Sequence, residues 1–519
     1  MGLTKLIRYQ GIRRKFKFDK ILQYAIIIPV SLAVSGILIM TDGKIEAAVA
    51  FIVLLTIVFI SFYRADWAFF IFFGMVLLFD QFIVSPTGDP ITWVVHYFDN
   101  IKGIPYLPHF DAGVMNPLEL QVALMLIGWF IALSTRRMAN VQRVPLWGLA
   151  ILLFIIIAFS LIHGLSTGGD FLPSLWEVRA LFYFLLLYFL VPQIIQTRQQ
   201  IDILLWVMII MISIKAFQGT VRFAQLGFSF GNSDCLTNHE DPVFIVDLWI
   251  LLISFLMFRV KVKQRTALLV LLLLMLTGFY SGQRRAAYAG LIVCLGVFII
   301  MLRPKEKLKF FRILLPILFV VACYSAIFWN HPGRIGAPVQ LIKSGFFESD
   351  KADAGERYSS NLYREVERYD LAATLQKSPI IGIGFGNKYL EPLFLVPIPF
   401  PLRDWIPHDE ILWLIVKMGA VGFFVFFFFI DALLFETAKI GRMLNDPFLR
   451  ALTIMIAAAI VNQIIVSYYD LQLTYYRNMV FLGTLCGLLP TIKTINRNQE
   501  INKMQMLNPQ VPTEAVIES

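Results

Sequence analysis

The sequence predicts an all-α polytopic membrane protein with about 12–14 transmembrane helices. Of its 519 residues, 58% are hydrophobic and 15% are charged, and the mean hydropathy is +0.72. A soluble chain of this length carries far more charge on its surface. Apolar runs close to the roughly 20 residues that cross a bilayer recur along the chain. They lie at about 21–40, 45–62, 67–84, 118–134, 145–163, 180–197, 201–225, 242–260, 266–281, 285–303, 309–330, 410–432, 450–468 and 475–492.

The basic residues predict the orientation of these helices. Lys and Arg outnumber Asp and Glu by 45 to 35, and they gather at 5–20, 136–143, 259–265 and 303–312. These segments fall in alternate loops, so the positive-inside rule predicts that they face the cytoplasm. This distribution argues against a nucleic-acid-binding face. Both termini fall on the same side as these loops.

The predicted orientation divides the chain into five parts. A basic cytoplasmic tail (1–20) precedes transmembrane helices (21–330), a large outer loop (331–407), the C-terminal transmembrane helices (408–492) and a cytoplasmic tail (493–519). The last tail is polar, contains Pro509 and Pro512, and is predicted to be disordered. The shorter segments 85–116 and 227–241 are also predicted to be outside. The four cysteines form no CxxC pair, so they indicate neither a disulfide framework nor a zinc site.

The large outer loop is predicted to contain short amphipathic helices. One covers Ser360–Gln376, with Arg364 and Arg368 four residues apart on one stripe. Another stripe has helical spacing and consists of Leu362, Val366, Tyr369 and Ala373. Two interpretations stay open: the helix is a solvated lid, or its Arg364 binds a ligand.

Proline and glycine follow this predicted helix. Pro379 ends it, because the residue before a proline is pushed out of the α region. Gly382, Gly384 and Gly386 then predict a flexible strip. The strip has neither the Gly-Lys-Ser/Thr of a P-loop nor the spacing of a dinucleotide fingerprint.

Arginines lie at the outer ends of apolar helices, where the positive-inside rule disfavours them. Arg179 follows Trp176-Glu177-Val178, and Arg284 and Arg285 lie in the short turn Ser281–Arg285. A guanidinium group matches phosphate oxygens with a planar fork of donors. These arginines therefore suit a diphosphate whose lipid tail stays in the bilayer. In the alternative interpretation, Arg179 pairs with Glu177 and one of the other two extends to the interface.

A histidine begins the apolar run after the outer loop. In Pro407-His408-Asp409-Glu410, the imidazole of His408 lies at the mouth of a membrane helix, where an ionisable group predicts a functional site. A neutral imidazole accepts a proton near pH 7, and Asp409 and Glu410 would stabilise the imidazolium. His408 is therefore a candidate general base. The alternative is a histidine that only satisfies hydrogen bonds.

The order of these motifs resembles the bacterial O-antigen ligase and O-antigen polymerase superfamily. The resemblance rests on the motifs that begin at Arg179, Ser281, Asn361, Pro379, His408 and Gly419, and it covers roughly 177–429. Its members transfer a glycan from a polyprenyl (undecaprenyl) diphosphate to an acceptor, without a cofactor or an essential metal. The resemblance implies a bacterial inner-membrane protein whose active site faces the periplasm.

The resemblance also assigns roles to residues. Arg179 and Arg284 would bind the diphosphate, with Arg285 and Arg364 as further candidates. His408 would activate the acceptor hydroxyl in a single inverting displacement. Asp409, Glu410 and Arg368 are possible supporting residues. The family usually has Asn after the histidine, so Asp409 departs from its pattern, and a negative charge there suits a diphosphate poorly.

Other functions stay open. A transporter or flippase of lipid-linked sugars would place charges deep in the membrane helices and relate two halves by symmetry. An export scaffold would keep the arginines without needing His408. His239-Glu240-Asp241 is an alternative metal-ligand cluster. No residue pattern separates a ligase from a chain polymerase or a protein oligosaccharyltransferase, and the partners expected are a lipid-linked glycan donor, a glycan or lipid-glycan acceptor and membrane lipids.

Overall fold

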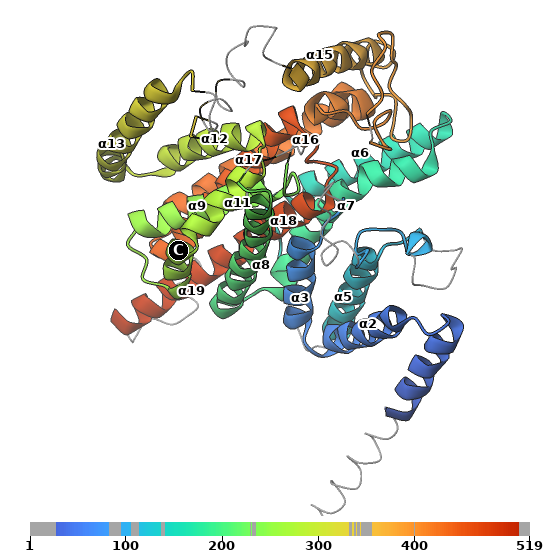
Figure 1. Cartoon of the computed structure of the whole chain (residues 1–519). Helices are drawn as coiled ribbons and strands as arrows, with labels where there is room; N and C mark the ends of the chain where they lie inside the picture. The colour runs from blue at the N-terminus through green and yellow to red at the C-terminus, as the bar shows by residue number, and fades with distance from the viewer. Residues whose placement is uncertain are drawn as a thin grey trace, which may run out of the picture. The chain divides into compact units, whose positions relative to one another are not determined.

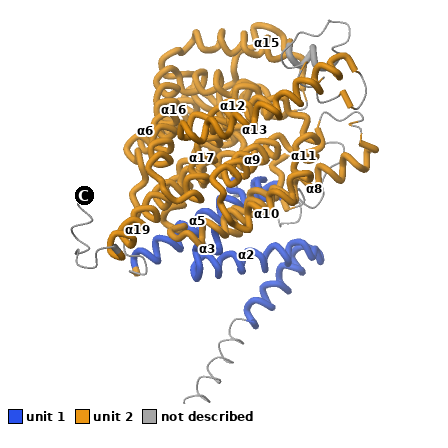
Figure 2. The backbone as a smooth tube through the Cα atoms, turned by 90° about the vertical axis from the view of Figure 1, so that its left-hand side faces the viewer, with its two compact units in different colours: residues 1–69, 96–134 blue, residues 70–95, 135–519 orange. Residues whose placement is uncertain are grey.

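All regular elements in the described part of the chain are helices, as predicted. The computed structural model describes residues 27–82, 95–104, 114–135, 141–228, 230, 235–331, 335–336, 339, 343, 355–398 and 400–507. The chain forms two compact units, residues 1–69 with 96–134 and residues 70–95 with 135–519 (Figure 2). The helix α3 (Ala65–Leu78) runs from the first unit into the second.

The first unit is a small helical assembly. Its described part contains a helix at Ile27–Met40, α2 (Ile45–Tyr63), a 3-10 turn η1 (Ile101–Gly103) and α5 (Pro117–Ser134). The helices α2 and α5 approach closely at Gly128, where an added Cβ would lie 2.6 Å from the carbonyl oxygen of Ser61. A small residue at this position lets the two backbones meet, as is common between membrane helices.

The second unit contains the remaining helices (Figure 1). They are α6 (Trp147–Ser166), α7 (Phe171–Ile194), α8 (Arg198–Gln225), α9 (Asp241–Met257), α10 (Lys263–Val270), α11 (Leu272–Ser281), α12 (Arg285–Met301), α13 (Pro304–Phe328), α15 (Gly355–Leu375), α16 (Glu410–Met443), α17 (Pro447–Tyr469), α18 (Tyr476–Gly487) and α19 (Leu489–Leu507). The helix α17 packs against α9, α12 and α16, and α18 packs against α7. These contacts form the core that supports the outer loops.

The membrane character of the helices agrees with the sequence. Nine helices in the described ranges are long and apolar enough to cross a membrane, and the bent pair α10–α11 would add a tenth. Three shorter apolar helices, Ile27–Met40, α3 and α12, fall in further predicted runs. The protein is therefore an all-α polytopic membrane protein. The predicted disorder of the C-terminal tail is wrong as far as Leu507, because α19 continues through the polar residues from Lys493; residues 508–519 lie outside the described residues.

The glycine strip of the outer loop is bound to a break in α16. At Gly419 the backbone leaves the helix with φ 65° and ψ −175°, a region that essentially only glycine adopts. The freed groups of α16 bond to the strip: Ala420 N–H donates to Pro379 O over 2.8 Å, and Ile383 N–H donates to Val416 O over 2.9 Å. The predicted flexible strip is thus paired with a membrane helix through main-chain hydrogen bonds.

The helix α15 presents a different face to the protein from the one predicted. Leu362 and Tyr369 of the predicted apolar stripe are 48% and 57% exposed. Among residues 362–375 of this helix, the buried side chains are Glu367, Asp370, Leu371 and Thr374. Each of these polar side chains has a partner: Asp370 accepts from Leu393 N–H and Thr374 accepts from Leu390 N–H. The inward face of α15 therefore combines these polar contacts with apolar packing around Leu371, to which Val366 of the predicted stripe contributes.

Candidate functional site

Three loops bring a histidine, an arginine and an aspartate together. His239 precedes α9, Arg284 caps the N-terminus of α12, and Asp470 follows α17. Nδ1 of His239 lies 2.9 Å from Oδ2 of Asp470, and Nη1 of Arg284 lies 3.7 Å from the same oxygen. Nη2 of Arg284 hydrogen-bonds Nε2 of His239 and lies 3.3 Å from Sγ of Cys235. The sequence predicted only Arg284 as a binding residue of this group.

Arg364 of α15 also acts on Asp470. Its positive charge helps to lower the pKa of that carboxyl group, and its Nε is buried without a hydrogen-bond partner among the described residues. We call the group of His239, Arg284, Arg364 and Asp470 the Asp470 cluster. The charges of two guanidinium groups act on one carboxylate in this cluster, which leaves an excess of positive charge among the four residues.

Burial and charge have opposite effects on Asp470. Burial raises its pKa, but the contact with His239 and the charges of Arg284 and Arg364 outweigh burial and hold the pKa well below its usual range. Asp470 is therefore a carboxylate near neutral pH. Burial lowers the pKa of His239, and the charge of Arg284 lowers it further. His239 is therefore neutral beside this ion pair.

His408 has a carboxylate partner that the sequence did not predict. Oε2 of Glu367 accepts the backbone N–H of His408 over 2.9 Å, and Oε1 lies 3.2 Å from Nδ1 of the ring. The ring of Tyr363 meets the imidazole edge-on, with 5.5 Å between the centroids. The side chain of Glu367 is 2% exposed, whereas that of His408 is 22% exposed. The pair thus has a buried carboxylate behind a partly open imidazole.

The two acidic residues after His408 have other partners. Asp409 caps α16 by accepting from Leu412 N–H over 3.1 Å, and its other oxygen lies 2.9 Å from Nε of Arg368. Arg368 also lies over the ring of Tyr468. Asp409 stays a predicted supporting residue, and its oxygens cap the helix and contact Arg368.

Glu410 links the His408 helix to the Asp470 loop. Its buried carboxylate accepts the backbone N–H groups of Gln472 and Leu473, and Thr474 donates to it through N–H and Oγ1. A buried carboxylate needs several such donors to offset its loss of hydration. Glu410 therefore holds the loop that begins at Asp470 against the start of α16, where His408 lies.

Part of this arrangement lies in a segment that is similar to a known family. Residues 270–427 match the family model of the O-antigen ligases. This segment is similar to the O-antigen ligases, and it is called the O-antigen ligase domain below. No curated protein sequence matches the chain. The O-antigen ligase domain contains Arg284, Arg364, Glu367 and His408, whereas His239 and Asp470 come from outside the matched residues.

Arg179 and Arg285 stay predictions for donor binding. Arg179 lies in α7 and is 5% exposed. Two residues before it, Glu177 forms a fully buried ion pair of 2.8 Å with Lys417 and accepts from Gly386 N–H over 2.6 Å. Glu177 therefore ties α7 to α16 and to the glycine strip of the O-antigen ligase domain. Arg285 begins α12 beside Arg284 and is partly buried.

The alternative metal site at His239-Glu240-Asp241 is not formed by these side chains. His239 turns to Asp470, whereas Asp241 lies 2.8 Å from Nη2 of the fully buried Arg477 and Glu240 lies 3.7 Å from its Nη1. Within the ranges that the structure describes, no group of three His, Cys, Asp or Glu side chains is arranged to hold a metal ion.

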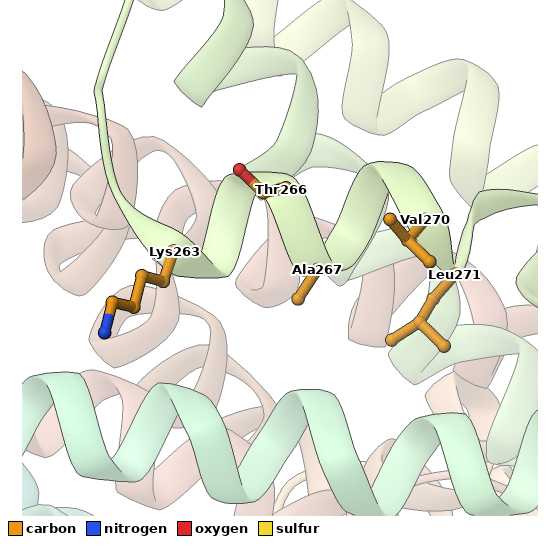
Figure 3. A pocket seen from close by; sticks show the side chains of 5 residues that line it. All are labelled: Lys263, Thr266, Ala267, Val270 and Leu271. Atoms are coloured by element: carbon orange, nitrogen blue, oxygen red, sulfur yellow. The ribbon is translucent and has the colours of Figure 1, made fainter.

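A cavity elsewhere in the second unit has different chemistry. It measures about 450 Å³ and lies along α10 at the bend before α11. Its lining consists of Lys263, Thr266, Ala267, Val270 and Leu271 (Figure 3). Lys263 is its sole titratable side chain, so the cavity has no acid–base pair. It shares no residue with the Asp470 cluster or with the His408 pair.

Residues outside the recognised motifs complete the site. Glu367 lies one turn beyond Arg364, Asp470 lies in the short loop between two apolar runs, and His239 lies in a predicted outer loop. Their placement in predicted outer segments was the available signal for them. No periodicity or spacing in the sequence indicates that these three segments meet.

Proposed function

We propose that this protein is a membrane glycosyltransferase that moves a glycan from a polyprenyl diphosphate to an acceptor hydroxyl. The observation that carries the proposal is the placement, within an O-antigen ligase domain, of the His408–Glu367 pair together with Arg284 and Arg364. An acid–base group supports activation of a hydroxyl. An excess of positive charge supports binding of a diphosphate.

The donor is proposed to bind through its diphosphate. Arg284 and Arg364 of the Asp470 cluster supply N–H donors, and Arg179 and Arg285 are further candidates from the sequence. Donors that are already aimed at the leaving group stabilise the charge that develops as the sugar departs, and each is worth on the order of 3 kcal/mol. The polyprenyl chain stays among the apolar helices.

His408 is proposed as the general base. A carboxylate can only accept, so Glu367 orients the ring with its proton on Nδ1 and leaves Nε2 to take a proton. The acceptor oxygen attacks the anomeric carbon while its proton passes to Nε2. The bond from that carbon to the diphosphate oxygen breaks, and its electron pair leaves with the diphosphate. One displacement inverts the anomeric centre.

The site is proposed to face the periplasm across a bacterial inner membrane. All the loops that contribute to it, those around 227–241, 282–284, 331–409 and 469–475, lie opposite the basic segments in the predicted orientation. The positive-inside rule places those basic segments in the cytoplasm. This side suits a reaction on glycans that have already crossed the membrane.

The proposal is tested by transfer with purified protein in lipid nanodiscs. The assay supplies a polyprenyl-diphosphate glycan and, in separate arms, a lipid-anchored oligosaccharide or a second donor glycan as acceptor. Product in the first arm indicates a ligase, and product in the second indicates a chain polymerase. We expect transfer by the wild-type protein to continue in a chelator. No product in either arm, together with no binding of the donor, would contradict the proposal.

The variant His408→Ala tests the role of the base. We expect transfer to fall by a factor on the order of 10² to 10⁴ while donor binding stays near that of the wild type. His163→Ala is the matched control, because His163 lies at the end of α6 and stacks on Phe159. Full transfer by His408→Ala would return this histidine to a purely structural role.

A further inference from the structure

We infer that His239 is a positioning residue that holds Arg284 in place for the donor diphosphate. The inference rests on the proposed function and adds a residue that lies outside the O-antigen ligase domain. His239 contacts Asp470 through one ring nitrogen and Arg284 through the other. It therefore connects the acidic and the basic member of the Asp470 cluster.

The chemistry of the two partners decides the tautomer of His239. A guanidinium group has donors but no acceptor, so Nε2 of His239 must accept from Nη2 of Arg284. The ring proton then lies on Nδ1, which is 2.9 Å from Oδ2 of Asp470 but makes no well-directed hydrogen bond to it. Only the neutral ring with the proton on Nδ1 places an acceptor toward Arg284 and an N–H toward Asp470. An acceptor at Nε2 thus requires the proton on Nδ1, and a proton on Nδ1 leaves Nε2 as the acceptor.

The backbone on both sides of His239 is anchored. Asn238 donates through its amide to Asp80, and Asp80 lies 2.6 Å from Nζ of Lys215. Asp241 is bound by Arg477, whose Nη2 also donates to the carbonyl oxygen of Leu77 over 2.7 Å. A buried network of charges thus holds the chain before and after His239. The imidazole is presented to Arg284 from a rigid support.

Arg284 has few other restraints. Its Nη2 contacts Sγ of Cys235, which is a weak acceptor, and its Nη1 lies 3.7 Å from Asp470. Its Nε is buried without a hydrogen-bond partner among the described residues. An enclosed, unsatisfied donor carries a free-energy cost that an oxygen ligand removes. Loss of the His239 acceptor would leave the guanidinium group free to turn toward Asp470.

Two substitutions at His239 separate its two contacts. In His239→Gln the amide oxygen can occupy the place of Nε2 and accept from Arg284, but the donor to Asp470 is lost. In His239→Asn the amide nitrogen can donate to Asp470 in place of Nδ1, but Arg284 loses its acceptor. His163→Gln and His163→Asn are the matched controls. All are assayed as full-length protein in nanodiscs for the donor KM and for kcat.

We expect His239→Asn to raise the donor KM about 10- to 100-fold, as loss of a charge-assisted hydrogen bond implies. We expect kcat to stay within about threefold, because His408 is untouched, and His239→Gln to remain near the wild type in both constants. Wild-type values for both variants would overturn the inference while leaving the proposed function standing. A fall in kcat at constant KM would also overturn it, because His239 would then act in the chemical step.

A double-substitution cycle distinguishes a specific effect of His239 on Arg284 from a folding defect. If His239 acts through Arg284, adding His239→Asn to Arg284→Lys raises the donor KM no further than Arg284→Lys alone. A general folding defect would instead add to the first loss. Binding of a polyprenyl diphosphate without a glycan is measured in parallel. If the wild type neither binds that lipid nor transfers glycan, the proposed function fails and the inference fails with it.

Discussion

At the scale of single residues, His408 depends on a partner from another helix. Glu367 presents both carboxylate oxygens to His408, one to the backbone N–H and one near Nδ1. The same arrangement of base and carboxylate fixes the tautomer of catalytic histidines in other enzymes and stabilises the imidazolium. Glu367 is thus expected to influence the chemical step although it does not touch the reacting atoms.

We predict that Glu367→Gln lowers kcat about 10- to 100-fold without changing the donor KM. The amide can still accept one hydrogen bond, but it removes the negative charge that stabilises the imidazolium, a difference of about 1.5–3 kcal/mol. Glu365→Gln, on the exposed face of the same helix, is the control. Steady-state kinetics of both variants check the prediction, and an unchanged kcat in Glu367→Gln would refute it.

At the scale of elements, the break in α16 joins the outer loop to the membrane helices. Gly419 makes the break possible through its positive φ, and a Cβ at this position would lie 2.2 Å from the carbonyl oxygen of Ile380. The strip that follows Pro379 bonds to the main chain on both sides of the break. The junction therefore connects the segment that follows α15, which contains Glu367, to α16, which begins just after His408.

We predict that Gly419→Ala destabilises the protein and lowers transfer. The backbone strain alone costs about 1–3 kcal/mol, and the close contact with Ile380 adds to it. The control is Gly148→Ala in α6, where an added Cβ meets nothing within 4 Å and alanine favours the helix. Thermal unfolding in detergent measures the effect. Equal melting temperatures for Gly419→Ala and wild type would show that the junction tolerates a side chain.

At the scale of the whole molecule, charge and hydropathy together predict which ends of the helices face outward. The loops that supply His239, Arg284, His408 and Asp470 alternate with the basic loops along the chain. Asp470 contacts His239 and Arg284, and Glu410 binds the loop after Asp470, so these loops lie near one another in the second unit. This proximity supports the predicted alternation.

We predict that a reporter fused after Lys307 behaves as cytoplasmic and that one inserted near Lys351 behaves as external. Lys307 lies at the start of α13 in a basic segment, and Lys351 lies in the large outer loop, outside the described residues. Paired enzymatic reporters that work only inside or only outside the cell make the measurement. The opposite pattern would contradict the proposal that the site faces the periplasm.

The sequence alone was sufficient for properties that follow from local composition. Apolar runs predicted the membrane helices because each must satisfy its own backbone hydrogen bonds in lipid. Arg284 and His408 stood out because charged or titratable groups at membrane level are costly without a purpose. The resemblance to the O-antigen ligase superfamily rested on these residues in order, and the family match agrees with it.

Only the tertiary structure decided which side chains meet. Glu367 faces His408 because the 367, 370, 371 and 374 face of α15 lies inward, whereas Leu362 and Tyr369 of the predicted apolar stripe are exposed. His239 and Asp470 meet Arg284 from loops far apart in the chain, and neither loop has a local pattern that specifies its partner. Asp409 and Glu410, adjacent to His408, instead bind Arg368 and the loop after α17. Neighbours along the chain are set by sequence, whereas hydrogen-bond partners between loops depend on the packing of every helix that carries them.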